Sequence, residues 1–352
     1  MVRLAPPPPA APPLPRAATP AENLGLALLG LWTVVGLFLD GWAHENLAGL
    51  ETFFTPWHGV LYSGLVAMAG WTAAIVQRRW QAGWRGGLAI PPGYQLGVAG
   101  LALFGVGGLA DFAWHTAFGI ERGIDALLSP PHLTMGLGAL LTLTSPWRAA
   151  WSDGGGGARP GWRVFLPVLL STALATAVVA FFFMYLSVFT GSDPSARRAT
   201  ASLLSSKQVG IAAVLLTNVV LFAPLLLLLR RWVLPFGSAT LLFTLTAGLM
   251  GALAEYRFWP AVLALALGGM GVDGIGWLLR PTPAHARRVR LFALLAPLLV
   301  WALFFALIAL TRGLSWSLEL VGGSLAWTSL SGLALSLLLF PPPLAQDPPA
   351  GA

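Results

Sequence analysis

Long apolar runs, each closed by a short polar segment, recur along the whole chain. Runs of about 20 residues are long enough to cross a bilayer as helices. The pattern predicts an all-α, polytopic membrane helical bundle of about ten transmembrane helices. They are expected at Leu24–Leu39, Pro56–Gln77, Gln95–His115, Pro131–Pro146, Val164–Leu186, Val209–Leu229, Phe236–Ala254, Pro260–Leu279, Leu291–Leu310 and Leu320–Phe340.

Helix starts are marked by local signals. Thr19, Pro20 and Glu22 read as a cap residue, a first-turn proline and a capping-box glutamate. Thr55-Pro56 and Ser129-Pro130 give the same cap and proline before the second and fourth apolar runs. We therefore expect the polar residues that follow these prolines to lie in the first turn of a helix.

Composition agrees with a membrane protein. The chain has 352 residues, of which 57% are hydrophobic and 9% charged, and its mean hydropathy is +0.76. Soluble domains carry about 25% charged residues, so no separate soluble domain is expected. The net charge of +7 comes from arginines that stand singly or in pairs between the apolar runs. This is typical of topology signals and not of a nucleic-acid surface.

The arginine distribution predicts the orientation of the chain. If both termini are cytoplasmic, most Arg and Lys residues fall on the cytoplasmic side, as the positive-inside rule requires. The chain then divides into four parts. These are a disordered Pro/Ala-rich cytoplasmic tail at 1–18, a duplicated helix-pair region at 19–147, the remaining transmembrane bundle at 164–340, and a Pro-rich cytoplasmic tail at 341–352.

One polar pattern occurs twice in the first half of the chain. Asp40 and His44 stand four residues apart, and a carboxylate, Glu51, precedes His58 by seven residues. The second copy has the same order and the same spacings, with a Thr/Ser-Pro step before the last histidine of each. Its members are Asp111, His115, Asp125 and His132.

The two copies suggest an internal repeat of a helix pair, at about residues 24–77 and 95–147. Two crossings restore the orientation of the chain, so parallel repeats would place both polar sets at the same outer level of the membrane. A third segment, 255–260, aligns with 51–56 but lacks the histidines.

Residues of these types at these spacings are suited to binding a metal. An Asp and a His at i and i+4 project from one face of a helix, and neutral imidazole is the form that binds metals. Nitrogen and oxygen donors without cysteine suit copper, iron or zinc, which the sequence does not distinguish. The alternative is that these groups only cap helices and hydrogen-bond each other. Ionisable residues near the hydrocarbon are expensive, which favours the metal site.

The Asp-x3-His…His arrangement resembles the copper-binding motif in the C-type subunit of the particulate methane and ammonia monooxygenases. The matching residues are Asp40, His44, His58 and Asp111, His115, His132. The resemblance implies copper ligation and oxygenase chemistry. The segment Glu51–His58 otherwise resembles bacterial multi-pass membrane proteins, so we expect the inner (plasma) membrane of a bacterium, with the site facing the periplasm.

The first functional hypothesis is a metal-dependent oxidoreductase that acts on a small or lipid-like substrate at the outer face. The alternatives are a transporter or permease, a b-type haem protein, a membrane zinc hydrolase, and a structural protein with polar caps. Whether the chain is an enzyme stays open at this point. Two deeper polar residues, Asp273 and Asn218, are interpreted either as functional groups or as packing contacts between helices.

Overall fold

The computed structural model describes residues 17–47, 53–119, 123–153, 159–189 and 207–341, and in these ranges every regular element is a helix. The α-helices are α1 (Pro20–Asn46), α2 (Pro56–Gln81), α3 (Gln95–Phe118), α4 (Gly123–Leu127), α5 (Pro130–Leu143), α6 (Ser145–Ser152), α7 (Trp162–Phe182), α8 (Lys207–Leu229), α9 (Ser238–Leu253), α10 (Trp259–Leu279), α11 (Ala286–Thr311) and α12 (Leu318–Leu339). Two 3₁₀ turns, η1 (Gly86–Ala89) and η2 (Met184–Leu186), complete them. The predicted tails lie almost wholly outside the described ranges.

The polytopic helical bundle is confirmed. Among the described residues, eight helices are long and apolar enough to cross a membrane, and α9 is a shorter apolar helix of 16 residues. The expected span at 131–146 is also shorter, because α5 ends at Leu143 and Pro146 opens the separate helix α6. Proline favours the first turn of a helix and disfavours its interior, which explains the break.

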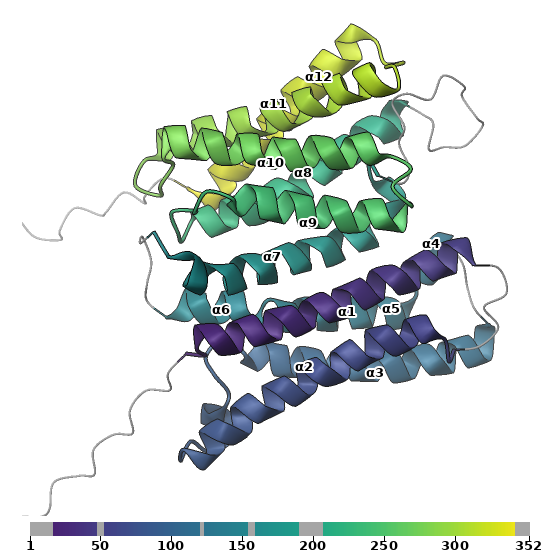
Figure 1. Ribbon diagram of the computed structural model, residues 1–352, viewed down its shortest axis with the longest axis vertical. Helices are drawn as coiled ribbons and strands as arrows, with labels where there is room; N and C mark the ends of the chain where they lie inside the picture. Colours follow the sequence, from purple (N-terminus) through teal and green to yellow (C-terminus); the bar gives the residue numbers. More distant parts are fainter. Residues whose placement is uncertain (1–16, 48–52, 120–122, 154–158, 190–206, 342–352) are drawn as a thin grey trace, which may run out of the picture.

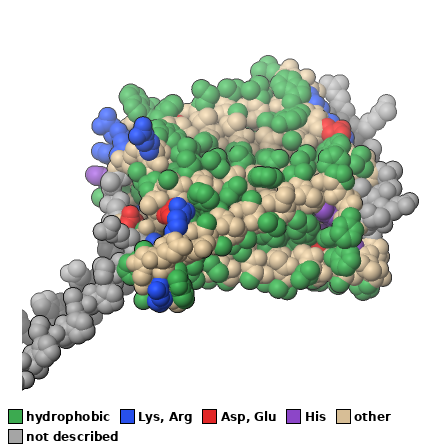
Figure 2. Space-filling model, turned by 60° about the horizontal axis from the view of Figure 1, so that its bottom comes forward, with side chains coloured by type: hydrophobic (Ala, Val, Ile, Leu, Met, Phe, Trp, Pro, Cys, Tyr) green, Lys and Arg blue, Asp and Glu red, His purple; other side chains and the backbone are tan. Residues whose placement is uncertain are grey.

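The long helices lie side by side as a stack, with α2 and α3 at one extreme and α11 and α12 at the other (Figure 1). α1 packs on α2, α3 packs on α5, and the central α7 contacts α1, α5 and α9. Successive long helices run in opposite directions, so the ends of α1 and α3 meet the starts of α2 and α5 at one end of the bundle (Figure 1). Lys and Arg side chains gather mainly at the opposite end, and an apolar belt separates the two (Figure 2).

The helix caps predicted at Thr19 and Thr55 form, whereas the Ser129 hydroxyl makes no cap hydrogen bond at the start of α5 and lies 3.0 Å from the His132 Nδ1 instead. The Thr19 hydroxyl accepts a hydrogen bond from the Glu22 backbone N–H at 3.2 Å, and the Glu22 carboxylate accepts from the Thr19 N–H at 2.9 Å. The Thr55 hydroxyl accepts from the His58 N–H at 3.1 Å. These bonds satisfy backbone donors that the first turn of a helix leaves free.

Small residues let α1 and α2 approach closely. A Cβ added to Gly64 of α2 would lie 2.6 Å from the Thr33 hydroxyl oxygen and 2.8 Å from the Thr33 Cα on α1. One added to Gly36 of α1 would lie 2.7 Å from the backbone of Leu61 on α2. Close backbone approach at small residues is a common way to pack membrane helices. It holds the end of α1 beside the start of α2.

The deeper polar residues serve packing. The buried Asp273 carboxylate accepts hydrogen bonds from the backbone N–H groups of Ala239 (3.0 Å) and Thr240 (2.9 Å) and from the Thr240 hydroxyl (2.6 Å). It therefore caps the first turn of α9 from the neighbouring helix α10. The buried Asn218 accepts a bond from the Trp301 indole at 2.9 Å and donates to Ser331 at 2.7 Å, which joins α8 to α11 and α12.

Candidate metal centre

Six of the eight predicted site residues lie together at the end of the bundle where α1, α2, α3 and α5 meet. Each set takes an aspartate and a histidine, at i and i+4, from near the end of one helix and a second histidine from the first turn of the next. The first set is Asp40 and His44 on α1 with His58 on α2, and the second is Asp111 and His115 on α3 with His132 on α5.

The other two predicted residues stand differently. Asp125 lies on α4, is exposed, and is not in either group of metal-ligating atoms formed by the described residues. Glu51 lies outside the described residues. Within the described part of the chain, the centre is built from two Asp–His–His sets.

Within each set, one nitrogen or oxygen atom from each residue lies within 4.8 Å of the others. In the first set, Asp40 lies 3.4 Å from the His58 Nε2 and 3.9 Å from the His44 Nε2. In the second set, one oxygen, Asp111 Oδ1, lies 3.3 Å from the His115 Nε2 and 3.2 Å from the His132 Nε2. All six side chains are buried or half-buried.

The two sets lie beside each other. The ring centroids of His44 and His115, which belong to different sets, are 6.3 Å apart and the rings are nearly parallel, at 21°. His58 and His115 are also 6.3 Å apart. Within the sets, His44 lies 5.8 Å from His58, and His115 lies 5.9 Å from His132. Four imidazoles and two carboxylates thus form one cluster.

Backbone carbonyls determine which ring nitrogen carries the proton. The Nδ1 of His58 lies 2.5 Å from the Phe53 carbonyl oxygen, and that of His132 lies 2.5 Å from the Ala126 oxygen. The Nδ1 of His115 lies 3.2 Å from the Gly119 oxygen. A carbonyl oxygen only accepts, so each Nδ1 donates a proton to it. The Nε2 atoms, which face the aspartates, then carry lone pairs when these rings are neutral.

Lone pairs therefore face lone pairs at the centre of each set. The Nε2 atoms of His58 and His115 and one oxygen each of Asp40 and Asp111 are buried and have no hydrogen-bond partner among the described residues. Buried polar atoms are nearly always paired, because leaving one unpaired is costly. One cation in each set, placed between its nitrogen and oxygen atoms, would pair with all of these atoms of that set at once.

Tyr62 and Phe53 are two neighbours of the cluster that sequence reasoning missed. The Tyr62 hydroxyl on α2 donates to the second oxygen of Asp111, Oδ2, at 3.3 Å, so it links the two helix pairs. The Phe53 ring lies 4.8 Å from His58 and 5.2 Å from Phe112 on α3, and covers the cluster on that side. Tyr62 stands four residues after His58, a spacing that could have indicated it.

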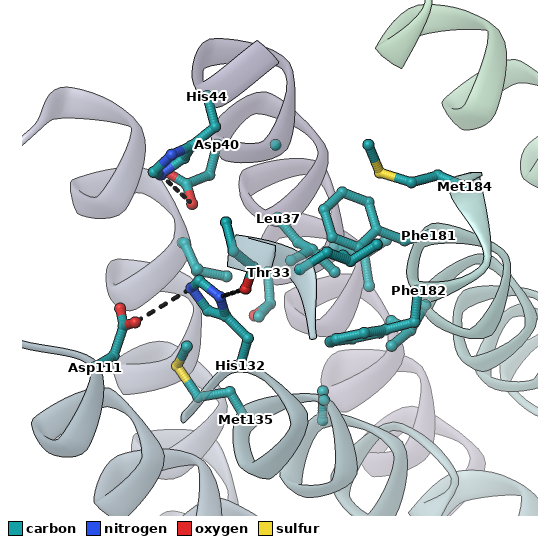
Figure 3. Close-up of a pocket in the computed structure, with 18 of the residues that line it drawn as sticks. Thr33, Leu37, Asp40, His44, Asp111, His132, Met135, Phe181, Phe182 and Met184 are labelled. Atoms are coloured by element: carbon teal, nitrogen blue, oxygen red, sulfur yellow. Dashed lines mark hydrogen bonds and ion pairs between the residues drawn. The ribbon is translucent and has the colours of Figure 1, made fainter. Parts of the chain in front are cut away.

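An apolar chamber of about 80 Å³ adjoins the cluster. Its polar wall includes Asp40, His44, His58, Asp111 and His132. Its apolar wall comes from α1, α4, α5 and α7, and includes Leu37, Leu127, Met135, Phe181, Phe182 and the following Met184. In Figure 3, Asp40 and His44 lie at the upper left of the chamber, and Asp111 and His132 lie below them. The apolar side chains of Phe181, Phe182 and Met184 lie at the right, across the chamber from these polar groups.

No protein-family model, no curated protein and no solved structure matches this chain. The six residues of the two Asp-x3-His…His patterns are the six that the structure brings together, in two groups that could each hold a metal ion.

Proposed function

We propose that this protein binds two transition metal ions, one in each Asp–His–His set, and acts as a membrane-embedded, metal-dependent oxidoreductase. The observation that carries the proposal is the facing of unpaired Nε2 and carboxylate oxygen atoms inside the cluster. Three imidazoles whose other nitrogen donates to a backbone carbonyl have the arrangement typical of metal-ligating histidines.

A purely structural role fits this geometry less well. The start of α2 already has its cap, because Thr55 accepts from the His58 N–H, and His58 is not needed for that purpose. If hydrogen bonds alone held the histidines and the aspartate of each set together, each Nε2 would be expected to donate a well-aligned hydrogen bond to an aspartate. His58 and His115 lie at ion-pair distance from Asp40 and Asp111, at 3.4 and 3.3 Å, but neither makes such an aligned hydrogen bond. Several imidazolium rings about 6 Å apart would also repel one another.

The donor atoms restrict the metal. Aspartate oxygens and imidazole nitrogens without thiolates suit copper, iron or zinc. A redox-active ion is favoured by the chamber beside the cluster, whose wall is mainly apolar. A small hydrocarbon-like substrate would suit such a wall and carries no bond to hydrolyse, so its transformation at the metal would be an oxidation or a reduction.

The other candidate functions have less support. The chamber of about 80 Å³ is small beside the 300–1,000 Å³ typical of pockets for larger organic ligands, which disfavours a haem. A transport path needs polar groups along the bundle, but the deeper Asp273 and Asn218 are engaged in packing. We also propose that the two helix pairs arose by duplication, and that the cluster faces the periplasm because the arginines gather at the other end.

Metal analysis of the purified full-length protein tests the proposal. We expect two ions per chain in the wild type. His58→Ala and His132→Ala should each lose an ion from its own set, whereas His285→Ala, which changes an exposed histidine on a different loop, should keep both. A wild type without stoichiometric metal would refute the metal centre. A bound metal that neither accepts nor releases electrons, as zinc would not, would refute the oxidoreductase and leave the metal site standing.

A further inference from the structure

A second cavity lies at the other end of the bundle, where Lys and Arg side chains gather (Figure 2). It is bounded by residues at the start of α7, the ends of α8 and α10, and the start of α9. Its volume is about 280 Å³. At the roughly 30 Å³ that a water molecule occupies in the liquid, this is room for about nine water molecules. None of the six residues of the Asp–His–His sets lines this cavity.

The cavity has an apolar interior and a basic mouth. Leu225, Leu229, Val272 and Phe292 are buried and form the inner wall. Arg159 and Arg280 line the mouth, and both residues are exposed. The one acid in the lining, Asp273, already accepts three hydrogen bonds from the start of α9, so its charge is engaged.

Two exposed tryptophans support a position of this mouth at the level of lipid headgroups. Trp162 and Trp277 line the cavity and are 42% and 62% exposed, and tryptophan is enriched where a bilayer meets water. Arg280 directly follows the last turn of α10, so its side chain starts from the same end of the bundle.

We propose that this cavity binds one anionic phospholipid. The two guanidinium groups hold the phosphate, and the upper part of an acyl chain lies along the apolar wall. Arginine pairs well with phosphate oxygens, and basic pockets between membrane helices on the cytoplasmic side bind anionic headgroups. A zwitterionic lipid would bring an extra cation to the two arginines. Free phosphate would leave the apolar wall uncovered.

Native mass spectrometry of the full-length protein, released from detergent with added lipid, tests the proposal. We expect the wild type to retain one phosphatidylglycerol at least tenfold more tightly than phosphatidylcholine. Exchange of both mouth arginines, Arg159→Gln with Arg280→Gln, should remove this preference. The control Arg288→Gln changes an exposed arginine that does not line the cavity, and should keep it.

A second pair of variants tests the cavity itself. Gly276 lines the cavity, and a Cβ added there would meet only the Phe292 ring, at 3.6 Å. Gly276→Leu should therefore fill the space and weaken lipid retention at least tenfold with both arginines present. Gly274→Leu, on the same helix with nothing within 4 Å of its Cβ, should not. Equal retention of both lipids, equal loss in Arg288→Gln, or full displacement by inorganic phosphate would each overturn the proposal. All of these results are independent of the metal content.

Discussion

The variant Asp111→Asn distinguishes two interpretations of the cluster, a metal centre and a buried ion-pair network. Asp111 is 1% exposed, and its Oδ1 lies 3.3 Å from the His115 Nε2 and 3.2 Å from the His132 Nε2. Asparagine has nearly the same shape but no charge, so the second set loses its only anionic ligand. Loss of a group that merely supports a ligand costs 10–100-fold in metal affinity. We expect about 100-fold here, which is roughly 2.8 kcal/mol.

The size of the effect on stability follows from mass action. At a free ion concentration of 100 times the dissociation constant, one site stabilises the folded protein by about 2.7 kcal/mol. A 100-fold rise in the dissociation constant leaves about 0.4 kcal/mol at the same concentration. The variant should therefore lose about 2.3 kcal/mol of the stabilisation that the ion gives to the wild type.

The metal-free protein should behave differently. Without an ion, Asp111 is a buried charge whose Oδ1 has no hydrogen bond, so its replacement should cost little stability. If the aspartate instead formed a buried ion pair with protonated histidines, the same variant would cost about 3–5 kcal/mol without any metal. The metal centre thus predicts that Asp111→Asn loses stability only when metal is present, and the ion-pair network predicts a loss in its absence.

Denaturant unfolding in detergent, followed by tryptophan fluorescence with and without a chelator, measures both quantities. Asp273→Asn is the matched control for the response to metal, because it makes the same exchange at a buried aspartate that does not contact the cluster, and its stability should respond to the chelator as the wild type does. A loss of 3–5 kcal/mol in chelator-treated Asp111→Asn, with no response of the wild type to metal, would refute the reasoning.

Three further outcomes are expected. Tyr62→Phe removes the hydroxyl that bonds Asp111 Oδ2 at 3.3 Å, so an ion titration should show about tenfold weaker binding at the second set and an unchanged first set; equal weakening of both would contradict this. Gly64→Ala, whose Cβ would lie 2.8 Å from the Thr33 Cα, should lower the free energy of unfolding by about 1–3 kcal/mol, whereas Gly70→Ala, with nothing within 4 Å, should not lower it. Asp273→Asn should lower the free energy of unfolding by about 1–3 kcal/mol, because it weakens the cap of α9, and it should leave ion binding unchanged. A change in metal content would contradict this, because it would show that Asp273 is coupled to the cluster.

Features that depend on neighbours within one helical turn were predicted from the sequence. The caps at Thr19 and Thr55 form as expected, and the i, i+4 spacing places Asp40 with His44 and Asp111 with His115. Eight of the ten expected spans are long apolar helices, and the other two, α5 and α9, are shorter helices of 14 and 16 residues. At α5, the proline that the prediction included in the span begins a new helix.

Features that depend on how distant helices meet were not predictable in the same way. The bond from Tyr62 to Asp111 needs the relative rotation of α2 and α3, which the spacing of residues along the chain does not give. The chamber needs Phe181, Phe182 and Met184, and nothing in the apolar run at the end of α7 marks them. Asp125 shows the limit of matched spacing, which suggested a ligand, because the short helix α4 leaves this residue exposed and outside the two groups. The identity of the ion and the side of the membrane stay predictions.

All six donors come from the stretch between Asp40 and His132, before the central helix α7 begins. Helices α8 to α12 supply no donor to either set, and α7 supplies no donor but lines the chamber with Val178, Phe181 and Phe182. If the cluster binds ions as we propose, the ion affinity and the shape of the chamber can therefore vary separately. Changes in α8 to α12 can alter the chamber wall through α7 without touching a donor atom.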